Sequence, residues 1–153
     1  ALVPKAEPLE RTSVRAIKNM LAGEGFHEML SYSFYSDASR RGDTLSMFCN
    51  GRFDHLEVEN PLNPDQQFLR KSVIPFVLKA LSKNISLEPE GGRLKLFEVG
   101  KIFIPRGKSL PLEDSILAGA VAFYEAVFCF RIFQQIFLRY RGVFQVSAYR
   151  NII

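Results

Sequence analysis

Apolar residues recur at steps of three and four over residues 72–85, and this spacing predicts a helix. The apolar stripe of this helix consists of Ile74, Val77, Leu78, Leu81 and Ile85. Pro75 falls in the opening turn, where its missing N–H costs least, while Lys79 and Lys83 fall on the opposite face. Such a one-sided helix must pack against another layer of structure.

A second helix is predicted near the N-terminus, behind a connecting arm over residues 1–10 that two prolines hold extended. Thr12 or Ser13 can cap this helix, and Gly23 can end it. The apolar face of the helix consists of Val14, Ile17 and Leu21. We therefore expect one folded domain over residues 11–153.

Alternation of polar and apolar residues predicts strands in the rest of the chain. From Glu28 to Tyr35, apolar residues alternate with serines, which is typical of a strand buried on one side. The inward side chains of this strand would be Leu30, Tyr32 and Phe34. Further strands are predicted over 94–99, 101–104 and 116–123, with weaker ones at 45–49 and at Leu56 and Val58.

Polar and glycine-containing segments predict the connections. Asn50-Gly51 and Gly91-Gly92 indicate turns, and the polar residues 106–114 indicate a loop. Gly100 interrupts a strand and indicates a bulge or a close approach of another group. Because helices and strands do not alternate regularly, the pattern favours an α+β fold, an antiparallel sheet flanked by helices.

The apolar run 126–138 is predicted to be a buried helix. The run is too short to cross a bilayer, which needs about twenty apolar residues, and Arg131 interrupts it. We therefore expect no membrane partner for this chain.

Composition narrows the class of protein. A chain of 153 residues with 47% hydrophobic and 24% charged residues is an ordinary globular domain. The net charge of +4 is compatible with RNA nearby, but the basic residues are scattered and favour a solvated surface. Two cysteines, Cys49 and Cys129, make no disulfide framework and have no metal spacing with the histidines. No signal peptide is visible, so a cytoplasmic location is expected.

Two charged residues in the middle of the chain are candidates for a site. Arg70 has the planar fork that pairs with carboxylates and phosphates, and we predict a buried or interfacial salt bridge for it. Glu98 lies between Phe97 and Val99 in a predicted strand, without a second carboxylate at clear spacing. A paired structural carboxylate is therefore favoured over a catalytic one.

An ordered set of motifs runs from Val58 to Phe103. It consists of Asn60-Pro61-Leu62, Leu69-Arg70-x-Ser72, Pro75, Leu78, Asn84 and Leu96-Phe97-Glu98-x-Gly100-x-x-Phe103. Upstream, Leu21, Gly25, Phe26, Glu28, Tyr32, Ser33 and Phe34 fit the pattern L-x-x-x-G-F-x-E-x-x-x-Y-S-F. By these residues the chain resembles the beta subunit family of phenylalanyl-tRNA synthetases, in its class II synthetase-like core domain of bacterial or organellar type. The resemblance weakens after about residue 122.

The resemblance also points to an absent active site. Catalytic class II synthetases continue the strand motif with F-R-x-E, where the arginine grips ATP and the acyl carboxylate. Here Phe103 is followed by Ile104, which has no donor, and Arg106 has the wrong sign for the glutamate. The glycine-rich third motif is also not visible. The resemblance therefore implies a synthetase fold without its own catalytic or cofactor-binding residues.

In this family two alpha and two beta chains associate, and the alpha chain charges tRNA(Phe) using ATP and magnesium. The resemblance implies that this chain is a scaffold for the alpha active site and binds tRNA only through the holoenzyme. The segment 60–72 corresponds to a dimer-interface region in catalytic relatives, and either an interface or a rigid scaffold fits its prolines. Two alternatives are a stand-alone paralogue that binds RNA or protein, and genuine catalysis by this chain.

Overall fold

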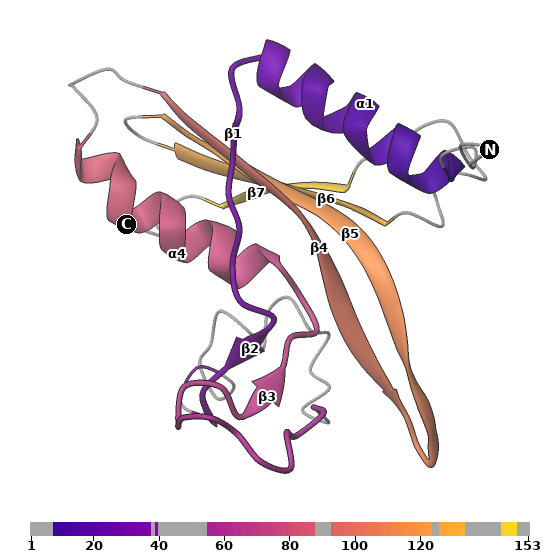
Figure 1. Ribbon diagram of the computed structural model, residues 1–153. Coiled ribbons are helices and arrows are strands. Elements are labelled where there is room, and N and C mark those ends of the chain that lie inside the picture. Colours follow the sequence, from indigo (N-terminus) through magenta and orange to yellow (C-terminus); the bar gives the residue numbers. More distant parts are fainter. Residues whose placement is uncertain are drawn as a thin grey trace, which may run out of the picture.

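The computed structural model describes residues 8–37, 39, 55–87, 93–123, 126–133 and 145–149. In the described residues, a helix lies on either side of a long twisted hairpin, and the short strands Phe34–Tyr35 and Phe68–Leu69 lie below them (Figure 1). Most of the connecting arm, the strand predicted at 45–49 and both predicted glycine turns lie outside these residues.

Helix α1 covers Leu9–Gly23 and begins earlier than predicted. The expected caps Thr12 and Ser13 are wrong, because Pro8 precedes the first turn and its carbonyl accepts the N–H groups of Arg11 and Thr12 at 3.0 and 3.3 Å. A proline tolerates this place because its fixed φ suits the entry to a helix. The buried side chain of α1 is Leu21.

The strand predicted from Glu28 to Tyr35 is replaced by two short strands, β1 (His27–Glu28) and β2 (Phe34–Tyr35). The predicted inward direction is also wrong for two residues, since Leu30 is 83% and Tyr32 is 76% exposed. The serines of this segment are the half-buried residues instead. Their partners are described with the candidate site.

The segment around Leu56 and Val58 is not a continuous strand. It makes one isolated bridge between Glu57 and Phe68, and β3 (Phe68–Leu69) pairs antiparallel with β2. Helix α4 (Ile74–Asn84) and the short 3-10 helix η1 (Ile85–Leu87) follow. The predicted helix is thereby confirmed, with its apolar stripe buried at Ile74, Val77, Leu78 and Leu81.

Strands β4 (Leu94–Arg106) and β5 (Ser109–Phe123) form one long antiparallel hairpin. The polar loop predicted over 106–114 is wrong, because only Gly107 and Lys108 turn the chain, with Gly107 at φ +60°. Pairing across the ladder outweighs the polar composition, and a glycine with positive φ allows the tight turn.

The helix predicted over 126–138 is also wrong in its described part. Residues Ala126–Phe133 form strand β6, which pairs antiparallel with β5, and β7 (Gln145–Tyr149) pairs with β6. A continuous apolar run suits a buried strand as well as a buried helix, so periodicity alone could not separate the two.

The main sheet has the order β1-β4-β5-β6-β7, with β1 parallel to β4 and all other pairs antiparallel. The predicted α+β class is confirmed, and the sheet is mixed rather than purely antiparallel. Helix α4 packs on one face, against the side chains of Leu94, Leu96, Ile102, Ile116, Ala118, Ala120 and Ala122. Leu21 of α1 packs against Phe97 and Leu117, whose alternate positions place them on the other face.

Within the described part of the chain, no helix is long and apolar enough to span a membrane.

Candidate functional site

A buried ion pair joins the end of β3 to the middle of β4. The Arg70 Nη1 atom lies 2.8 Å from the Glu98 Oε1 atom, and the two side chains are 3% and 1% exposed. Removing two charges from water is costly, so such a pair persists only where further hydrogen bonds complete it. This is the buried salt bridge that the sequence predicted for Arg70, and Glu98 is its paired carboxylate.

Ser31 closes the network between the two charges. Its hydroxyl donates to Glu98 Oε2 at 2.7 Å and accepts from Arg70 Nη1 at 2.7 Å. A hydroxyl can do both at once, because it carries one donor and two acceptor positions. Ser31 therefore ties the segment between β1 and β2 to the ion pair.

The backbone of Arg70 and its neighbours makes the network rigid. The Arg70 N–H donates to the Ser33 carbonyl at 2.9 Å, and the Arg70 carbonyl accepts from the Phe103 N–H at 2.9 Å. The Arg70 Nε atom donates to the Lys101 carbonyl at 2.7 Å, and the guanidinium lies 5.7 Å from the Phe76 ring centroid. One arginine thus joins the segment before β2 to β4 and α4.

Gly100 leaves the space that the guanidinium occupies. A Cβ atom on Gly100 would lie 2.2 Å from Arg70 Nη2 and 2.9 Å from Glu98 Oε1, both too close for a real contact. Only glycine fits at this point of β4, so the predicted close approach is confirmed. The register to β5 is continuous here, and the bulge that the sequence also allowed is absent from this position.

The geometry of this network indicates a structural role, and we call the network of Arg70, Glu98 and Ser31 the buried lock. Its carboxylate and guanidinium are almost fully buried and bind each other. Their other hydrogen-bond partners are Ser31 and the Lys101 carbonyl. A catalytic carboxylate must reach a substrate proton at hydrogen-bonding distance. The arrangement instead holds three segments of chain in one place.

The other predicted site residues lie around this network or away from it. Ser72 and Phe97 are buried, Pro75 and Phe103 are half-buried, and Asn84 is exposed near the end of α4, where its amide bonds the Ala80 carbonyl at 2.7 Å. The loop residues are all exposed, namely Asn60, Pro61 and Leu62. Of the predicted site residues, the network therefore involves Arg70, Glu98, Gly100 and Phe103.

Ser31 is the residue of this network that the sequence did not predict. The alternation from Glu28 to Tyr35 was interpreted with the large apolar residues inward, and the serines were assigned to solvent. The one available signal was Arg70 together with Glu98, because a buried ion pair needs polar neighbours. That signal does not identify which serine supplies them.

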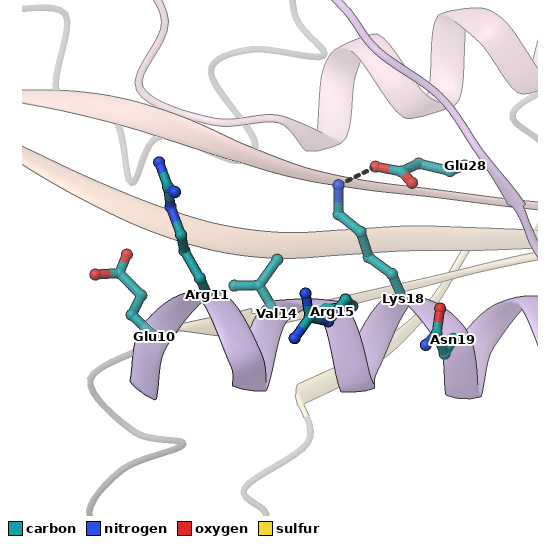
Figure 2. A pocket seen from close by; sticks show the side chains of 7 residues that line it. All are labelled: Glu10, Arg11, Val14, Arg15, Lys18, Asn19 and Glu28. Atoms are coloured by element: carbon teal, nitrogen blue, oxygen red, sulfur yellow. Dashed lines mark ion pairs between the residues drawn. The ribbon is translucent and has the colours of Figure 1, made fainter. Parts of the chain in front are cut away.

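A second feature is a cleft beside α1, with a volume of about 420 Å³. Figure 2 shows Arg11, Val14 and Lys18 extending from one side of the helix, and the ion pair between Lys18 and Glu28. The full lining consists of Glu10, Arg11, Val14, Arg15, Lys18, Asn19 and Glu28. This cleft is open, and its lining includes charged side chains of both signs.

Two sequence comparisons with known proteins agree on one family. A family model described as the phenylalanyl tRNA synthetase beta chain CLM domain matches residues 1–126. The phenylalanine–tRNA ligase beta subunit of Dehalococcoides mccartyi is 30% identical over 121 residues, which is 78% of this chain and 14% of that protein. The beta subunit of Syntrophus aciditrophicus is 32% identical over 120 residues, 77% of this chain and 14% of that protein.

The fold comparison gives a distant match. The structure of a pyrrolysyl tRNA synthetase from Desulfitobacterium hafniense aligns with a TM-score of 0.53 at 13% identity, over 81% of this chain and 38% of that chain. This likeness concerns the fold alone. The chain spans about 14% of the length of the curated relatives it matches. Through the family model over residues 1–126, the chain belongs to the phenylalanyl-tRNA synthetase beta chain family, as its CLM domain.

Proposed function

We propose that this chain is a non-catalytic, class II synthetase-like core that supports the alpha-chain active site in the charging of tRNA(Phe) with phenylalanine. In this proposal residues 1–10 are a connecting arm and residues 11–153 the core, a mixed sheet flanked by helices. The chain works in the cytoplasm, and tRNA reaches it only through the holoenzyme of two alpha and two beta chains. Membership of the beta-chain family supports this role.

The observation that carries the proposal is an inverted segment between β1 and β2. Ser31 is held inside by Arg70 and Glu98, while Leu30 and Tyr32 are 83% and 76% exposed. Polar residues inside and apolar residues outside reverse the usual arrangement, and neighbouring exposed apolar side chains of this kind support an interaction site here. We infer that the alpha chain covers Leu30 and Tyr32.

The position of β1 in the sheet supports the same inference. Among the described strands, β1 pairs only with β4 and lies at the edge of the sheet. An edge strand presents unpaired backbone groups that a partner can use. The network around Arg70 keeps the following segment in place, so the surface is formed before the partner arrives, which lowers the entropic cost of binding.

The motif from Asn60 to Ser72 divides into two parts. Leu62 is 93% exposed on its loop, whereas Arg70 and Ser72 are 3% and 1% exposed. We propose that the loop half contributes to the interface and that the second half is the scaffold. Both roles that the sequence left open then apply, to different residues.

The residues at the position of the lost synthetase motif do not fit ATP. Ile104 packs against the core beside α4, and Arg106 is exposed at the end of β4. No group of three or more metal-binding side chains occurs among the described residues. We therefore assign ATP and magnesium to the alpha chain and derive no chemical step from this chain.

The proposal is tested by co-expressing the full chain with the phenylalanyl-tRNA synthetase alpha chain and measuring the complex by size-exclusion chromatography with light scattering. A stable stoichiometric complex is expected. A soluble chain that forms no complex with the alpha chain would favour a stand-alone paralogue that binds RNA or protein. Exchange of pyrophosphate into ATP by the isolated chain would contradict the loss of the active site.

A paired variant makes the test specific to the inverted segment. Leu30→Ser with Tyr32→Ser should weaken the complex by tenfold or more, since central apolar anchors carry about 2 kcal/mol or more of binding energy. The matched control is Leu110→Ser, because Leu110 is 88% exposed on the hairpin arm. The control should bind as the wild type does.

A further inference from the structure

The cleft between α1 and β1 has an assignable ligand. We propose that Arg11 in this cleft binds a carboxylate side chain of the alpha chain, so that the interface has a charged anchor beside its apolar centre. This inference rests on the proposed function, because the alpha chain is the partner in both. It adds a site and a chemistry that the family match does not supply.

The first support is the state of the charges in the cleft. Lys18 is already paired with Glu28 across one end of the cleft, and Arg15 has an interaction within the chain. In the part of the chain that the structure describes, the Arg11 side chain has no hydrogen bond or ion pair. Arg11 is thus a cation that remains available for a ligand.

The second support is the direction of these side chains. Positions 11, 14 and 18 fall on one side of a helix, at steps of three and four. Figure 2 shows Arg11 and Lys18 extending from this side, with Val14 between them. A ligand group bound by Arg11 would therefore contact the apolar side chain of Val14, and the Lys18–Glu28 pair would lie beyond it.

The mixture of charges selects the class of ligand. Glu10 and Glu28 both line the cleft, and a run of phosphates in a nucleic acid would be repelled by them. A single carboxylate needs only the two parallel donors of one guanidinium, a geometry that arginine supplies. The cleft therefore favours an acidic side chain on a protein over an RNA backbone.

The third support is continuity with the inverted segment. Glu28, Leu30 and Tyr32 are all exposed and occupy every second position, so they follow one side of an extended chain. The cleft begins at Glu28, next to the apolar pair. Protein interfaces commonly have such an apolar centre with a polar rim, and arginine is enriched among their strongest contacts.

The test measures binding of the co-expressed, purified alpha chain to three forms of the full chain. Arg11→Glu should weaken binding at least tenfold and reduce its dependence on salt, since an attraction between opposite charges would become a repulsion. Arg106→Glu makes the same charge change at the hairpin tip, away from α1 in Figure 1, and should leave binding unchanged. Thermal melts of each form check folding, which an exposed arginine should not affect.

Three results would overturn the anchor while leaving the proposed function intact. Arg11→Glu could bind the alpha chain as tightly as the wild type, or both arginine variants could lose the same amount of affinity. Arg11→Glu could also weaken only the binding of tRNA by the complex, which would point to an RNA phosphate. Failure of the wild-type chain to bind the alpha chain would instead remove the proposed function and the anchor together.

Discussion

Two ion pairs lie three residues apart on strand β4 and behave as opposites. The Glu98 side chain and its partner Arg70 are 1% and 3% exposed, whereas Lys101 and its partner Glu113 are 60% and 52% exposed. An odd separation on a strand places Glu98 and Lys101 on opposite faces. The distances are similar, 2.8 and 2.6 Å, so distance does not distinguish them.

The difference between the two pairs is what surrounds them. Around Arg70 and Glu98 lie Ser31, the Lys101 carbonyl and Gly100, whose missing side chain leaves room for the guanidinium. Water surrounds the other pair, and exposed pairs contribute little because solvent screens them. An ion pair fixes the positions of chain segments where it is shielded from water and where protein groups supply the hydrogen bonds that water would otherwise make.

The largest effect should come from removing one charge of the buried pair. Glu98→Gln keeps the shape but leaves Arg70 as a buried cation without its counter-charge, and we expect a loss of about 3–5 kcal/mol of unfolding free energy. Urea denaturation of the full chain measures it. Glu113→Gln, the same change in the exposed pair, is the control, and equal losses in both variants would contradict the comparison.

The next effect concerns the space above Gly100. Gly100→Ala places a Cβ atom against the guanidinium, so Arg70 must move, and we expect a loss of about 1–3 kcal/mol. Gly23→Ala is the matched control, because nothing lies within 4 Å of a Cβ there. The idea fails if both alanine variants denature at the same urea concentration.

Ser31→Ala should have an effect of similar size on the same network. It removes a donor to Glu98 and an acceptor for Arg70, and one unsatisfied buried group costs about 1–3 kcal/mol. Ser39→Ala, whose hydroxyl bonds Ser36 at the surface, is the control. Urea denaturation should separate the two variants, and identical midpoints would mean that Ser31 is not part of the lock.

The smallest effect is expected at the exposed pair, where it is present at neutral pH and is lost at alkaline pH. The hydrogen bond to Glu113, then its charge, raises the pKa of Lys101 above 10.5. A raised pKa contributes stability below the ordinary value, and this contribution is lost as the pH rises through the raised value. The stability difference between wild type and Glu113→Gln should therefore be small at neutral pH. It should vanish once the pH exceeds the raised pKa of Lys101.

Urea denaturation at a series of pH values from 7 to 12 measures this difference. Because Lys101 is exposed, the neutral-pH difference should be far smaller than that of Glu98→Gln. A difference that grew as the pH rose above 10.5 would contradict the assigned sign.

Predictions from the sequence were confirmed where the type or spacing of a few residues determines the local structure. The stripe of Ile74, Val77 and Leu81 predicted α4, and Gly100 predicted a close approach. Arg70 and Glu98 predicted a pair, since a charged residue within an apolar strand needs a partner. These inferences use spacing or charge, which the chain displays without its tertiary structure.

Predictions from the sequence were wrong where contacts with residues distant in the chain determine the structure. The apolar run from Ala126 became a strand because β5 pairs with it, and the polar residues after Arg106 continue a ladder rather than a loop. Leu30 and Tyr32 face outward because Ser31 is needed inside by groups 39 and 67 residues away. Alternation gives the period of a strand but does not say which side is buried.

The central claim is that the buried lock presents Leu30 and Tyr32 to the alpha chain. Hydrogen–deuterium exchange of the full chain, alone and in complex with the alpha chain, tests it most directly. We predict slower exchange of residues 29–33 in the complex, with no change at the Gly107 turn of the hairpin. Unchanged exchange over residues 29–33 in a complex that has formed would contradict the claim.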